Sequence, residues 1–389
     1  IDYTCDLISA VMNGEQILKV ACVGAGSITR EFSLKHLSDC DAVEVVAIVD
    51  INVDAAISLA TDVRYRRAGA SIIGTKYCET VDKSSVNMSI DDMPEVAVAT
   101  TLASVLPLCD IVYVGTPPSS HAAITIEVLQ AKKHVILEKP LAISLDDCTA
   151  IVDAADAAFK NDQLFVNVNI GMRHNAALHE MKRLIQHESF GDIVDITLRN
   201  LFMQWPRVWQ NQPWVGQRAQ GGPLEEVGTH WLFGILELFG HECYRGVDCS
   251  ITYPDGKDGI LCESHCNGEL LLSCNNTDRM VKIRIDSTSD EAKNAGKDIY
   301  ELEVVGSSGE SYTLYDFTKL KDKHGTDILA SKVVCAEDGT APGTYGRMEC
   351  IVELVKAIRG DVPGANLVTP AQARNAQIII EAMKTSRSC

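Results

Sequence analysis

The residues most able to do chemistry stand at 138–140, where an apolar run meets a glutamate, a lysine and a proline. The run, residues 135–137, is typical of a strand buried in a parallel sheet, and we expect it to be the last strand of that sheet. Pro140 cannot continue a central strand, so it ends the run and directs Lys139 away from it. Lys139 then stands at the carboxyl end of a parallel strand, where open α/β sheets bind ligands. The alternative is a lysine that only solvates the end of a strand.

An acid and a histidine, Glu226 and His230, form a second pair able to exchange protons with a substrate. They follow a pair of glycines and lie four residues apart, so on a helix that opens near Gly228 their side chains could reach one pocket. Histidine titrates near neutral pH and can take the proton of a hydroxyl group. Considered alone, His230 could equally be a helix-face histidine bonded to the backbone.

The stretch upstream of Lys139 has the pattern of a dinucleotide-binding domain. An apolar strand at residues 17–23 runs into Gly24 and Gly26, which permit a tight turn and a close approach of the backbone to a pyrophosphate. A second apolar strand, residues 43–49, ends in Asp50, about 20 residues beyond the glycines, where a carboxylate binds the ribose 2′-hydroxyl. The same carboxylate would repel a 2′-phosphate, so the sequence favours NAD over NADP. The expected cofactor contacts at this turn are Gly24, Gly26, Ser27, Ile28 and Asp50.

A further strand at residues 110–115 leads into a rigid loop with two prolines. Thr116 and Pro117 stand where this strand ends, at the same edge of the sheet as Lys139, and we expect both to contact the cofactor. His121 lies in the first turn of the helix that follows. There it either contacts the nicotinamide end of the cofactor or faces solvent.

The glycine pair, the acid after the second strand, the proline loop and the tripeptide Glu138-Lys139-Pro140 occur in one order along the chain. In this order they resemble the Gfo/Idh/MocA family of NAD(P)-dependent sugar oxidoreductases. Residues 221–230 look like the family's second signature, in which a glycine pair leads to an acid and a histidine. Further segments with the family's pattern are a late strand with its turn and the last two helices, at residues 302–309, 345–360 and 369–386.

The resemblance implies an α/β Rossmann domain with a doubly wound parallel sheet in residues 1–160. It also implies an α+β domain in residues 161–368, which would bind substrate, oligomerise and contain a large, mainly antiparallel, open-faced sheet. The helix at 369–386 could pack back on the first domain. Hairpin-like spacing supports the second sheet, with strands expected at residues 193–198, 249–253, 259–264, 269–274, 281–286, 300–305 and 311–315. An open sheet face usually needs a cover, which predicts a homodimer or homotetramer.

The same resemblance implies a dehydrogenase or reductase acting on CH–OH groups, which moves a hydride between a sugar, cyclitol or related polyol and the nicotinamide. Lys139, His230 and Glu226 would be catalytic, and Glu138 and Lys139 would also line the cofactor site. Lys139 would stabilise the alkoxide, His230 would take the proton, and Glu226 would orient His230 or bind a hydroxyl. Either Lys139 or His230 could be the formal base. Two alternatives stay open: a non-catalytic dinucleotide-binding regulator, and a redox-neutral lyase or glycosidase that retains NAD.

Three features depart from the family's pattern. Thr29 stands where the glycine fingerprint has its third glycine, and Glu226 stands where the second signature usually has aspartate. Residues 74–101 are longer than the usual connection between the third and fourth strands, and loops of this length tend to be functional or disordered. Such an insertion could dock a partner protein, which is the feature that favours a regulator.

A loop rich in tryptophan precedes the second signature. Trp205, Trp209 and Trp214 stand among prolines, glutamines and Arg207, and aromatic rings beside such polar groups suit a carbohydrate. The same tryptophans could instead pin the loop to its own domain. Other candidate contacts to substrate are Arg173, His174 and Thr229.

The composition argues against several classes of protein. With 389 residues, 46% of them apolar and 23% charged, the chain has the composition of a globular protein of two domains. A net charge of −18, from 35 basic and 53 acidic side chains, argues against nucleic acid or an anionic membrane as a partner. Since no apolar run approaches the roughly 20 residues that cross a bilayer, and no secretory segment is recognisable, we expect neither a membrane span nor export.

The 14 cysteines have irregular spacing and many lie in apolar segments, which indicates free thiols and a cytoplasmic location. The one cluster able to bind metal consists of Cys262, His265, Cys266 and Cys274. Its spacing matches no common zinc pattern, and we expect no metal. In a cytoplasmic protein the glycosylation sequons at Asn87 and Asn275 would be accidental.

Overall fold

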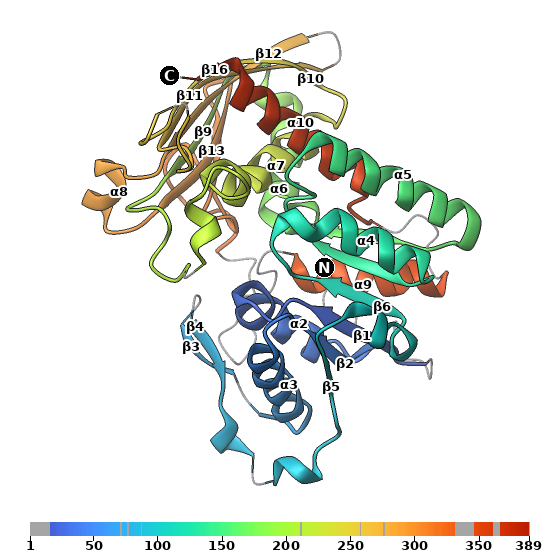
Figure 1. Ribbon diagram of the computed structural model, residues 1–389. Helices are drawn as coiled ribbons and strands as arrows, with labels where there is room; N and C mark the ends of the chain where they lie inside the picture. The colour runs from blue at the N-terminus through green and yellow to red at the C-terminus, as the bar shows by residue number, and fades with distance from the viewer. Residues whose placement is uncertain are drawn as a thin grey trace. The chain divides into compact units, whose positions relative to one another are not determined.

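The computed structural model describes residues 16–70, 72–75, 78–86, 88–210, 212–256, 258–274, 277–330, 346–360 and 366–388. The chain forms two compact units (Figure 1). The first unit contains the described residues up to Ala142, then Asp146–Asn169 and Arg347–Pro370. The second contains Ile143–Leu145, Ile170–Gly346 and the chain from Ala371 onward. The first unit therefore runs past the boundary expected at residue 160, and a segment from near the C-terminus completes it.

The first unit is built around a sheet of six parallel strands, and the expected α/β class is confirmed. Numbered along the chain, its strands lie in the order 3-2-1-4-5-6, which is the strand order of the Rossmann fold. From edge to edge they are β5 (Ala97–Ala99), β2 (Val43–Val49), β1 (Leu18–Val23), β6 (Ile111–Val114), β7 (His134–Glu138) and β8 (Val166–Asn169).

The apolar run at residues 135–137 lies in β7, which is not the last strand of the sheet as expected. β8 pairs with it in parallel along its length. The side chain of Asn167 holds β8 in place, because its nitrogen donates to the carbonyl of Cys350 and its oxygen accepts the backbone N–H of Val368. The polar residues in this strand are buried only because such distant partners satisfy them.

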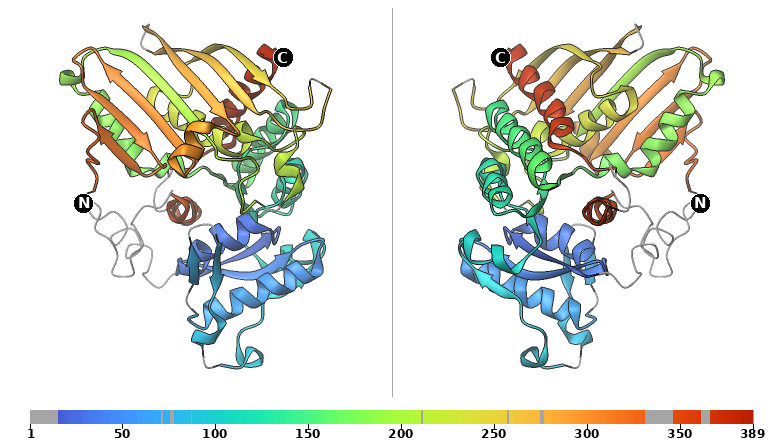
Figure 2. Two further views of the ribbon diagram at one scale, coloured as in Figure 1. Left: turned by 90° about the vertical axis from the view of Figure 1, so that its left-hand side faces the viewer. Right: turned by 90° about the vertical axis from the view of Figure 1, so that its right-hand side faces the viewer.

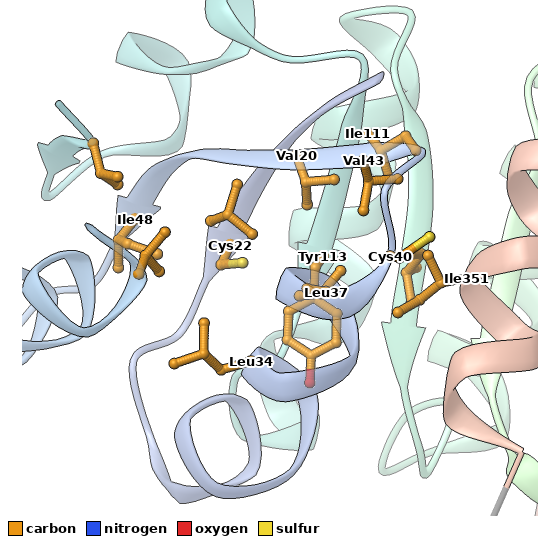
Figure 3. Packing of buried hydrophobic residues seen from close by; sticks show 14 of the residues in the cluster. Val20, Cys22, Leu34, Leu37, Cys40, Val43, Ile48, Ile111, Tyr113 and Ile351 are labelled. Atoms are coloured by element: carbon orange, nitrogen blue, oxygen red, sulfur yellow. The ribbon is translucent and has the colours of Figure 1, made fainter. Parts of the chain in front are cut away.

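Apolar packing joins one face of this sheet to the helices α2 (Leu34–Asp39), α3 (Val53–Arg67) and α9 (Arg347–Arg359). Tyr113 lies in the same cluster, and its hydroxyl points out of the apolar side chains (Figure 3). This places one polar group at the boundary of an otherwise apolar core. The remaining helices of this unit follow β6 and β7, and they are α4 (His121–Gln130) and α5 (Leu145–Asp162).

The segment expected as a long loop is partly regular, and it precedes the third strand of the sheet, β5, instead of following it. After α3 the chain forms a two-stranded antiparallel hairpin, β3 (Ile72–Thr75) with β4 (Cys78–Val81). The guanidinium of Arg64 then donates to the carbonyl oxygens of Ile90 and Met93. The connection is therefore tied to α3 on its way to β5.

The second unit contains an eight-stranded sheet that is mainly antiparallel, as expected. Five strand pairings are antiparallel, while β9 with β12 and β10 with β16 are parallel. From edge to edge the strands are β15 (Lys319–Asp322), β14 (Ser311–Tyr315), β13 (Ile299–Gly306), β9 (Ile193–Leu201), β12 (Thr277–Asp286), β11 (His265–Cys274), β10 (Tyr244–Thr252) and β16 (Arg387–Ser388).

Helices α6 (Ala176–Ile185), α7 (Thr229–Phe239) and α10 (Pro370–Ser386) lie on one face of this second sheet (Figure 2). Apolar side chains alternate along the strands, and in β13 every second residue is buried. From Ala371 onward the C-terminal helix α10 belongs to this unit, whereas α9 is the helix that packs on the first sheet. None of the helices in the described ranges is long and apolar enough to cross a membrane.

The opposite face of the second sheet is open and carries ion pairs between strands. Arg199 on β9 pairs with Glu301 on β13 at 2.9 Å, and Lys282 on β12 pairs with Asp195 on β9 at 2.5 Å. The short helix α8 (Asp290–Ala295) follows β12 and contributes Glu291 to the same charged group. A charged surface of this kind is stable in water. The sheet therefore does not need a second layer on this face to shield apolar side chains.

The strand expected at residues 259–264 is not formed. Here the carboxylate of Asp255 accepts the backbone N–H groups of Ile260 and Leu261, at 2.6 and 2.8 Å, and folds the chain into a turn. Leu261 forms a single isolated bridge, to Gln217. The alternating residues therefore only resemble a strand, since an aspartate side chain has taken the hydrogen bonds that a neighbouring strand would need.

Candidate active site

The glycine loop after β1 needs its first glycine for space. Gly24 has a φ of +96°, and a Cβ there would lie 2.6 Å from the carbonyl oxygen of Gly115. Thr29, at the third fingerprint position, donates its hydroxyl to the carbonyl of Gly24 at 2.7 Å. A Cβ on Gly115 would lie 2.4 Å from that hydroxyl oxygen. The loop therefore accommodates a threonine in place of the third glycine, because Thr29 fills the space beside Gly115 and its hydroxyl bonds to the loop backbone.

The absence of a side chain at Gly26 matters for a different reason. It is exposed, and nothing lies within 4 Å of the position that a Cβ would take. None of the described residues occupies this space, which leaves room for a ligand to approach the backbone, as a pyrophosphate requires. The half-buried Ser27 and Ile28 follow, and Ile28 opens a π-helical turn, η1 (Ile28–Ser33), which leads into α2.

Asp50 lies directly against this loop. One carboxylate oxygen accepts the backbone N–H of Ala25 at 2.7 Å, and the other accepts the backbone N–H of Asn52 at 2.8 Å. The carboxylate is half-buried, and each oxygen keeps a lone pair for a further donor. Position, charge and free acceptor capacity fit a ribose hydroxyl at this point.

His121 is placed differently from either expectation, since it is fully buried and its ring contacts the chain's own backbone. Its Nδ1 lies 2.9 Å from the carbonyl oxygen of Pro140 and its Nε2 lies 3.0 Å from that of Thr116. Burial lowers the pKa of this histidine, although both carbonyls favour the charged ring. His121 therefore joins the loop after β6 to the segment that follows β7. In the same loop Ser120 donates to the Thr116 hydroxyl at 2.7 Å or to the Pro117 carbonyl at 2.8 Å.

Glu138 is buried, with 2% of its surface exposed, and anchors the end of β7. Its Oε1 accepts the hydroxyl of Tyr113 at 2.8 Å, the amide of Asn169 at 2.7 Å and the hydroxyl of Ser33 at 3.3 Å. The guanidinium of Arg347 lies 3.7 Å away. Burial and the neighbouring Glu138 charge raise the pKa of Tyr113, so the tyrosine remains a proton donor.

The sequence predicted that Glu138 contacts the cofactor directly, and it predicted none of these four partners. Its structural task is to fix the strand end from which Lys139 departs. Lys139 itself is half-buried, and the peptide bond to Pro140 is cis. Only the position of Tyr113 in an apolar strand could have hinted at a buried polar partner.

In the second unit, two glycines open the segment that carries Glu226. A Cβ on Gly221 would lie 2.3 Å from the carbonyl oxygen of Trp214, and one on Gly222 would lie 2.6 Å from Oε2 of Glu263. The chain then forms a π-helical turn, η10 (Leu224–Gly228), that continues into α7. Such turns recur at functional sites because the extra residue redirects side chains.

The two adjacent acids of this turn have different surroundings. Glu225 is 2% exposed, and its Oε1 accepts hydrogen bonds from Gln377 at 3.0 Å and from Lys384. Glu226 is only half-buried, while His230, one helical turn later, is 6% exposed and packs edge-on against Phe317. Glu226 is therefore the acid that remains accessible beside His230.

The comparisons with known proteins agree with this geometry. Residues 18–168 match the Gfo/Idh/MocA model, described as an oxidoreductase family with an NAD-binding Rossmann fold. Residues 18–168, nearly all of them in the first unit, are thus similar to the NAD-binding Rossmann domain of this family. A curated relative, a glycosyl hydrolase family 109 protein of Shewanella sp. (strain W3-18-1), is 34% identical over 85 residues. That match spans 22% of this chain and only 18% of the relative.

Solved structures share the fold over nearly the whole chain. The WlbA dehydrogenase from Bordetella pertussis, in complex with NADH and UDP-GlcNAcA, has a TM-score of 0.67 at 18% identity and covers 96% of both chains. The aldose–aldose oxidoreductase from Caulobacter crescentus, complexed with glycerol, has a TM-score of 0.69 at 17% identity. That likeness covers 95% of this chain and 97% of the other.

In the second unit, outside the residues that match the family model, the tryptophan loop is held by contacts within itself. The indole nitrogen of Trp205 donates to the carbonyl of Val215 at 3.1 Å. The guanidinium of Arg207 lies 5.2 Å from the ring centre of Trp205 and 4.6 Å from that of Trp209, as in cation–π contacts. All three tryptophans remain half-exposed, so pinning does not remove their ring faces from solvent.

Two expected substrate contacts are engaged elsewhere in the second unit. Arg173 pairs with Glu237 at 3.1 Å and lies over the ring of Phe233. Thr229 is 2% exposed and donates its hydroxyl to the carbonyl of Glu225 at 2.8 Å. These contacts explain both side chains through packing of the helix ends, so neither is retained as a substrate contact.

The cysteines that were considered as metal ligands lie in separate environments. Cys262 is buried in the loop after Asp255, and Cys266 lies beside Cys249 on the neighbouring strand. His265 pairs with Asp286 at 3.3 Å. Among the described residues no three metal-ligating side chains come together. The sequons at Asn87 and Asn275 lie outside the described residues.

Glu263 is the residue of this site that the sequence did not single out, and its pKa is unusual. Burial raises the pKa from near 4.5 to about 7 and the Glu225 charge adds to this, although the N–H of Leu224 and the charge of Lys384 oppose it. Folding thus favours the protonated acid. The resulting stabilisation is present below pH 4.5 and is lost as the pH rises through 7.

Replacing Glu263 with glutamine should therefore flatten the pH dependence of stability. Wild-type protein should lose about 3 kcal/mol of unfolding free energy, relative to the variant, between pH 4.5 and 7. Urea denaturation at several pH values measures this, with the exposed Glu269→Gln as the control. Equal pH slopes for wild type and Glu263→Gln would contradict the prediction.

Proposed function

We propose that the protein is an NAD-preferring oxidoreductase. It transfers a hydride between a secondary hydroxyl or hemiacetal carbon of a sugar, cyclitol or related polyol and the nicotinamide. The observation that carries this proposal is the edge of the first sheet, where Asp50 is bonded to the glycine loop and Glu138 anchors the strand end of Lys139. The ligands of two structures with a similar fold, NADH with UDP-GlcNAcA in one and glycerol in the other, support a polyhydroxy substrate.

Gly24, Gly26, Ser27, Ile28 and Asp50 would hold the pyrophosphate and ribose, and Thr116 and Pro117 would complete this surface. NAD, when bound, supplies the hydride acceptor. Lys139 would stabilise the negative charge that develops on the substrate oxygen. His230 would hold the hydroxyl proton, and Glu226 would orient His230 or bind a neighbouring hydroxyl. Trp205, Trp209, Trp214 and Arg207 would offer ring faces and polar groups to the substrate.

The function is tested by NADH absorbance when the protein meets NAD and a panel of aldoses, sugar phosphates, nucleotide sugars, inositols and diols. NADH formation with one substrate class is the expected result. Silence across the panel with NAD binding intact would remove the dehydrogenase proposal. The remaining explanations would then be a non-catalytic regulator or a redox-neutral enzyme.

A redox-neutral glycosidase is a second candidate, favoured by the 34% identity to a glycosyl hydrolase family 109 protein. Such an enzyme would retain NAD and hydrolyse nitrophenyl glycosides without net NADH production. Release of nitrophenol that requires bound NAD would select this function over the first. The short length of the match makes it the less supported of the two.

Asp50→Asn should weaken the preference for NAD over NADP by about tenfold. Asparagine keeps an oxygen for the N–H of Ala25 but removes the charge that repels a 2′-phosphate. The measurement is the ratio of the Kd values for NADH and NADPH by fluorescence titration. Asp54→Asn, at an exposed position on α3, is the control. An unchanged ratio in Asp50→Asn would show that this acid does not set the preference.

A homodimer or homotetramer in the cytoplasm is proposed as well. Nine cysteines of the described residues are buried free thiols, which suits a reducing compartment. The open sheet face holds a shallow cavity of about 290 Å³ lined by Arg199, Glu303 and Lys321, so a second copy would meet a charged surface. Light scattering that shows a monomer at micromolar concentration would remove the oligomer.

A further inference from the structure

A partly buried lysine connects the C-terminal helix α10 to the π-helical turn that carries Glu226. Lys384 and Gln377 both donate to Oε1 of Glu225, from 159 and 152 positions away in the sequence. The side chains of Lys384 and Glu225 are 18% and 3% exposed. The contact therefore joins a buried carboxylate to a partly buried amine and is reinforced by a neutral hydrogen bond, unlike the ion pairs on the open sheet face.

The same turn is held at two further points. At its start, Oε1 of Glu263 accepts the backbone N–H of Leu224 at 2.7 Å. Just after its end, the hydroxyl of Thr229 donates to the carbonyl of Glu225 at 2.8 Å. The side chain of Glu225 is the anchor between these two points, and the next residue, Glu226, is the acid that stays accessible.

Stability alone does not account for a lysine at this place. Burying an ion pair removes two charges from water, and an apolar pair of similar size is often equally stable. Burial by itself would lower the pKa of Lys384, but Glu225 and Glu381 outweigh it and the pKa is raised. The amine thus stays charged, and a charge-assisted hydrogen bond constrains direction in a way that an apolar contact does not.

We propose that Lys384 and Glu225 are positioning residues, which hold the η10 turn so that Glu226 and His230 present their side chains to substrate in one fixed geometry. This inference rests on the proposed roles of Glu226 and His230. According to this proposal, the C-terminal helix α10 helps to position the catalytic side chains, although neither Lys384 nor Glu225 contacts the reacting atoms.

The double variant Glu225→Leu/Lys384→Met of the full chain separates positioning from stability. It leaves no partner of the pair charged and unpaired. Gln377 loses its acceptor on Glu225 but keeps Glu381 at 3.4 Å, so we expect the variant to fold with a moderately lowered melting temperature. We nevertheless expect kcat to fall about 10²-fold, because small displacements of catalytic groups cost this much. The Kd for NADH should stay within about twofold, the scatter expected for a site the variant leaves untouched. A wild-type kcat in this variant would overturn the proposal.

Two further variants serve as comparisons in this experiment. Asp195→Leu/Lys282→Met removes an exposed ion pair of the same unit, and its kcat should match that of wild type. Glu225→Gln keeps an oxygen acceptor for both donors and should retain most of the wild-type kcat. If Glu225→Gln were as impaired as the double variant, the hydrogen bonds would not be the anchor and the proposal would fail.

A second readout does not depend on activity. With ¹³C at Cε1 of the histidines, the NMR signal of His230 is identified by its loss in His230→Gln. We expect it to shift in Glu225→Leu/Lys384→Met and to stay in place in Asp195→Leu/Lys282→Met. An unshifted His230 signal in Glu225→Leu/Lys384→Met would refute the positioning role even if no substrate is known. If the signal shifts but the wild-type protein turns over no substrate, only the proposed function is refuted. Where the double variant does not fold, Gln377→Leu should shift the same signal, and an unchanged signal there would equally refute the proposal.

Discussion

Lys139→Ala is expected to lower kcat by about 10³-fold while NAD binding stays unchanged. The amine would stabilise the charge that develops on the substrate oxygen, and alanine offers no donor to replace it. The strand end itself should survive, because Glu138 and His121 hold it through their own hydrogen bonds. The expected result is thus a loss of chemistry without a loss of the nucleotide site.

The measurement pairs steady-state NADH formation with a titration of NADH binding by fluorescence. Lys132→Ala is the control, since this lysine is 69% exposed and its partner among the described residues is Asp162. Retained turnover in Lys139→Ala would remove this lysine from the mechanism and leave His230 as the base. Loss of both turnover and NADH binding would instead show that Lys139 serves the cofactor.

Glu138→Ala is expected to destabilise the first unit by about 3–5 kcal/mol. The carboxylate accepts hydrogen bonds from Tyr113, Asn169 and Ser33, all of which are buried. Alanine would remove the acceptor of the Asn169 amide and of the Ser33 hydroxyl and leave Tyr113 with Ser33 alone as an acceptor. Arg347 would also lose its ion-pair partner Glu138. The effect on stability should therefore exceed that of any exposed glutamate in this unit.

Differential scanning calorimetry measures this loss, because added NADH raises the melting temperature of the unit that binds it and so identifies its transition. Glu127→Ala, at an exposed position on α4, is the control and should leave that transition in place. Glu138→Gln, which keeps one oxygen acceptor, should fall between the two. An unchanged transition in Glu138→Ala would mean that the Tyr113 network contributes little.

Backbone requirements were predicted well because they are local. The turn at Gly24, the strand end at Pro140 and the place of Asp50 follow from steric limits and from the period of apolar residues, which a few neighbouring residues decide. The same holds for the parallel strands of the first unit and most strands of the second. The failure at residues 259–264 is also local, since Asp255 captures the N–H groups that the pattern had assigned to a strand.

Side-chain roles were predicted less well, because they depend on partners far away in the chain. The motif that contains Glu138 was recognised, but its neighbours Asn169 and Arg347 come from other elements, and they make it an anchor. His121 was expected at the surface or at the cofactor, yet the fold closes over it and gives both ring nitrogens a carbonyl.

The sequence by itself thus determined the class of fold, the edge of the first sheet at which Asp50 and Lys139 lie, and the kind of cofactor to expect. The four-residue spacing to His230 had already selected Glu226, whereas tertiary structure alone gave its neighbour Glu225 a role. No nearby residue predicts that role, because the partner of Glu225, Lys384, lies 159 residues further along. Burial and pairing of charges arise only when distant elements pack, which is why one glutamate is an anchor and the next stays accessible.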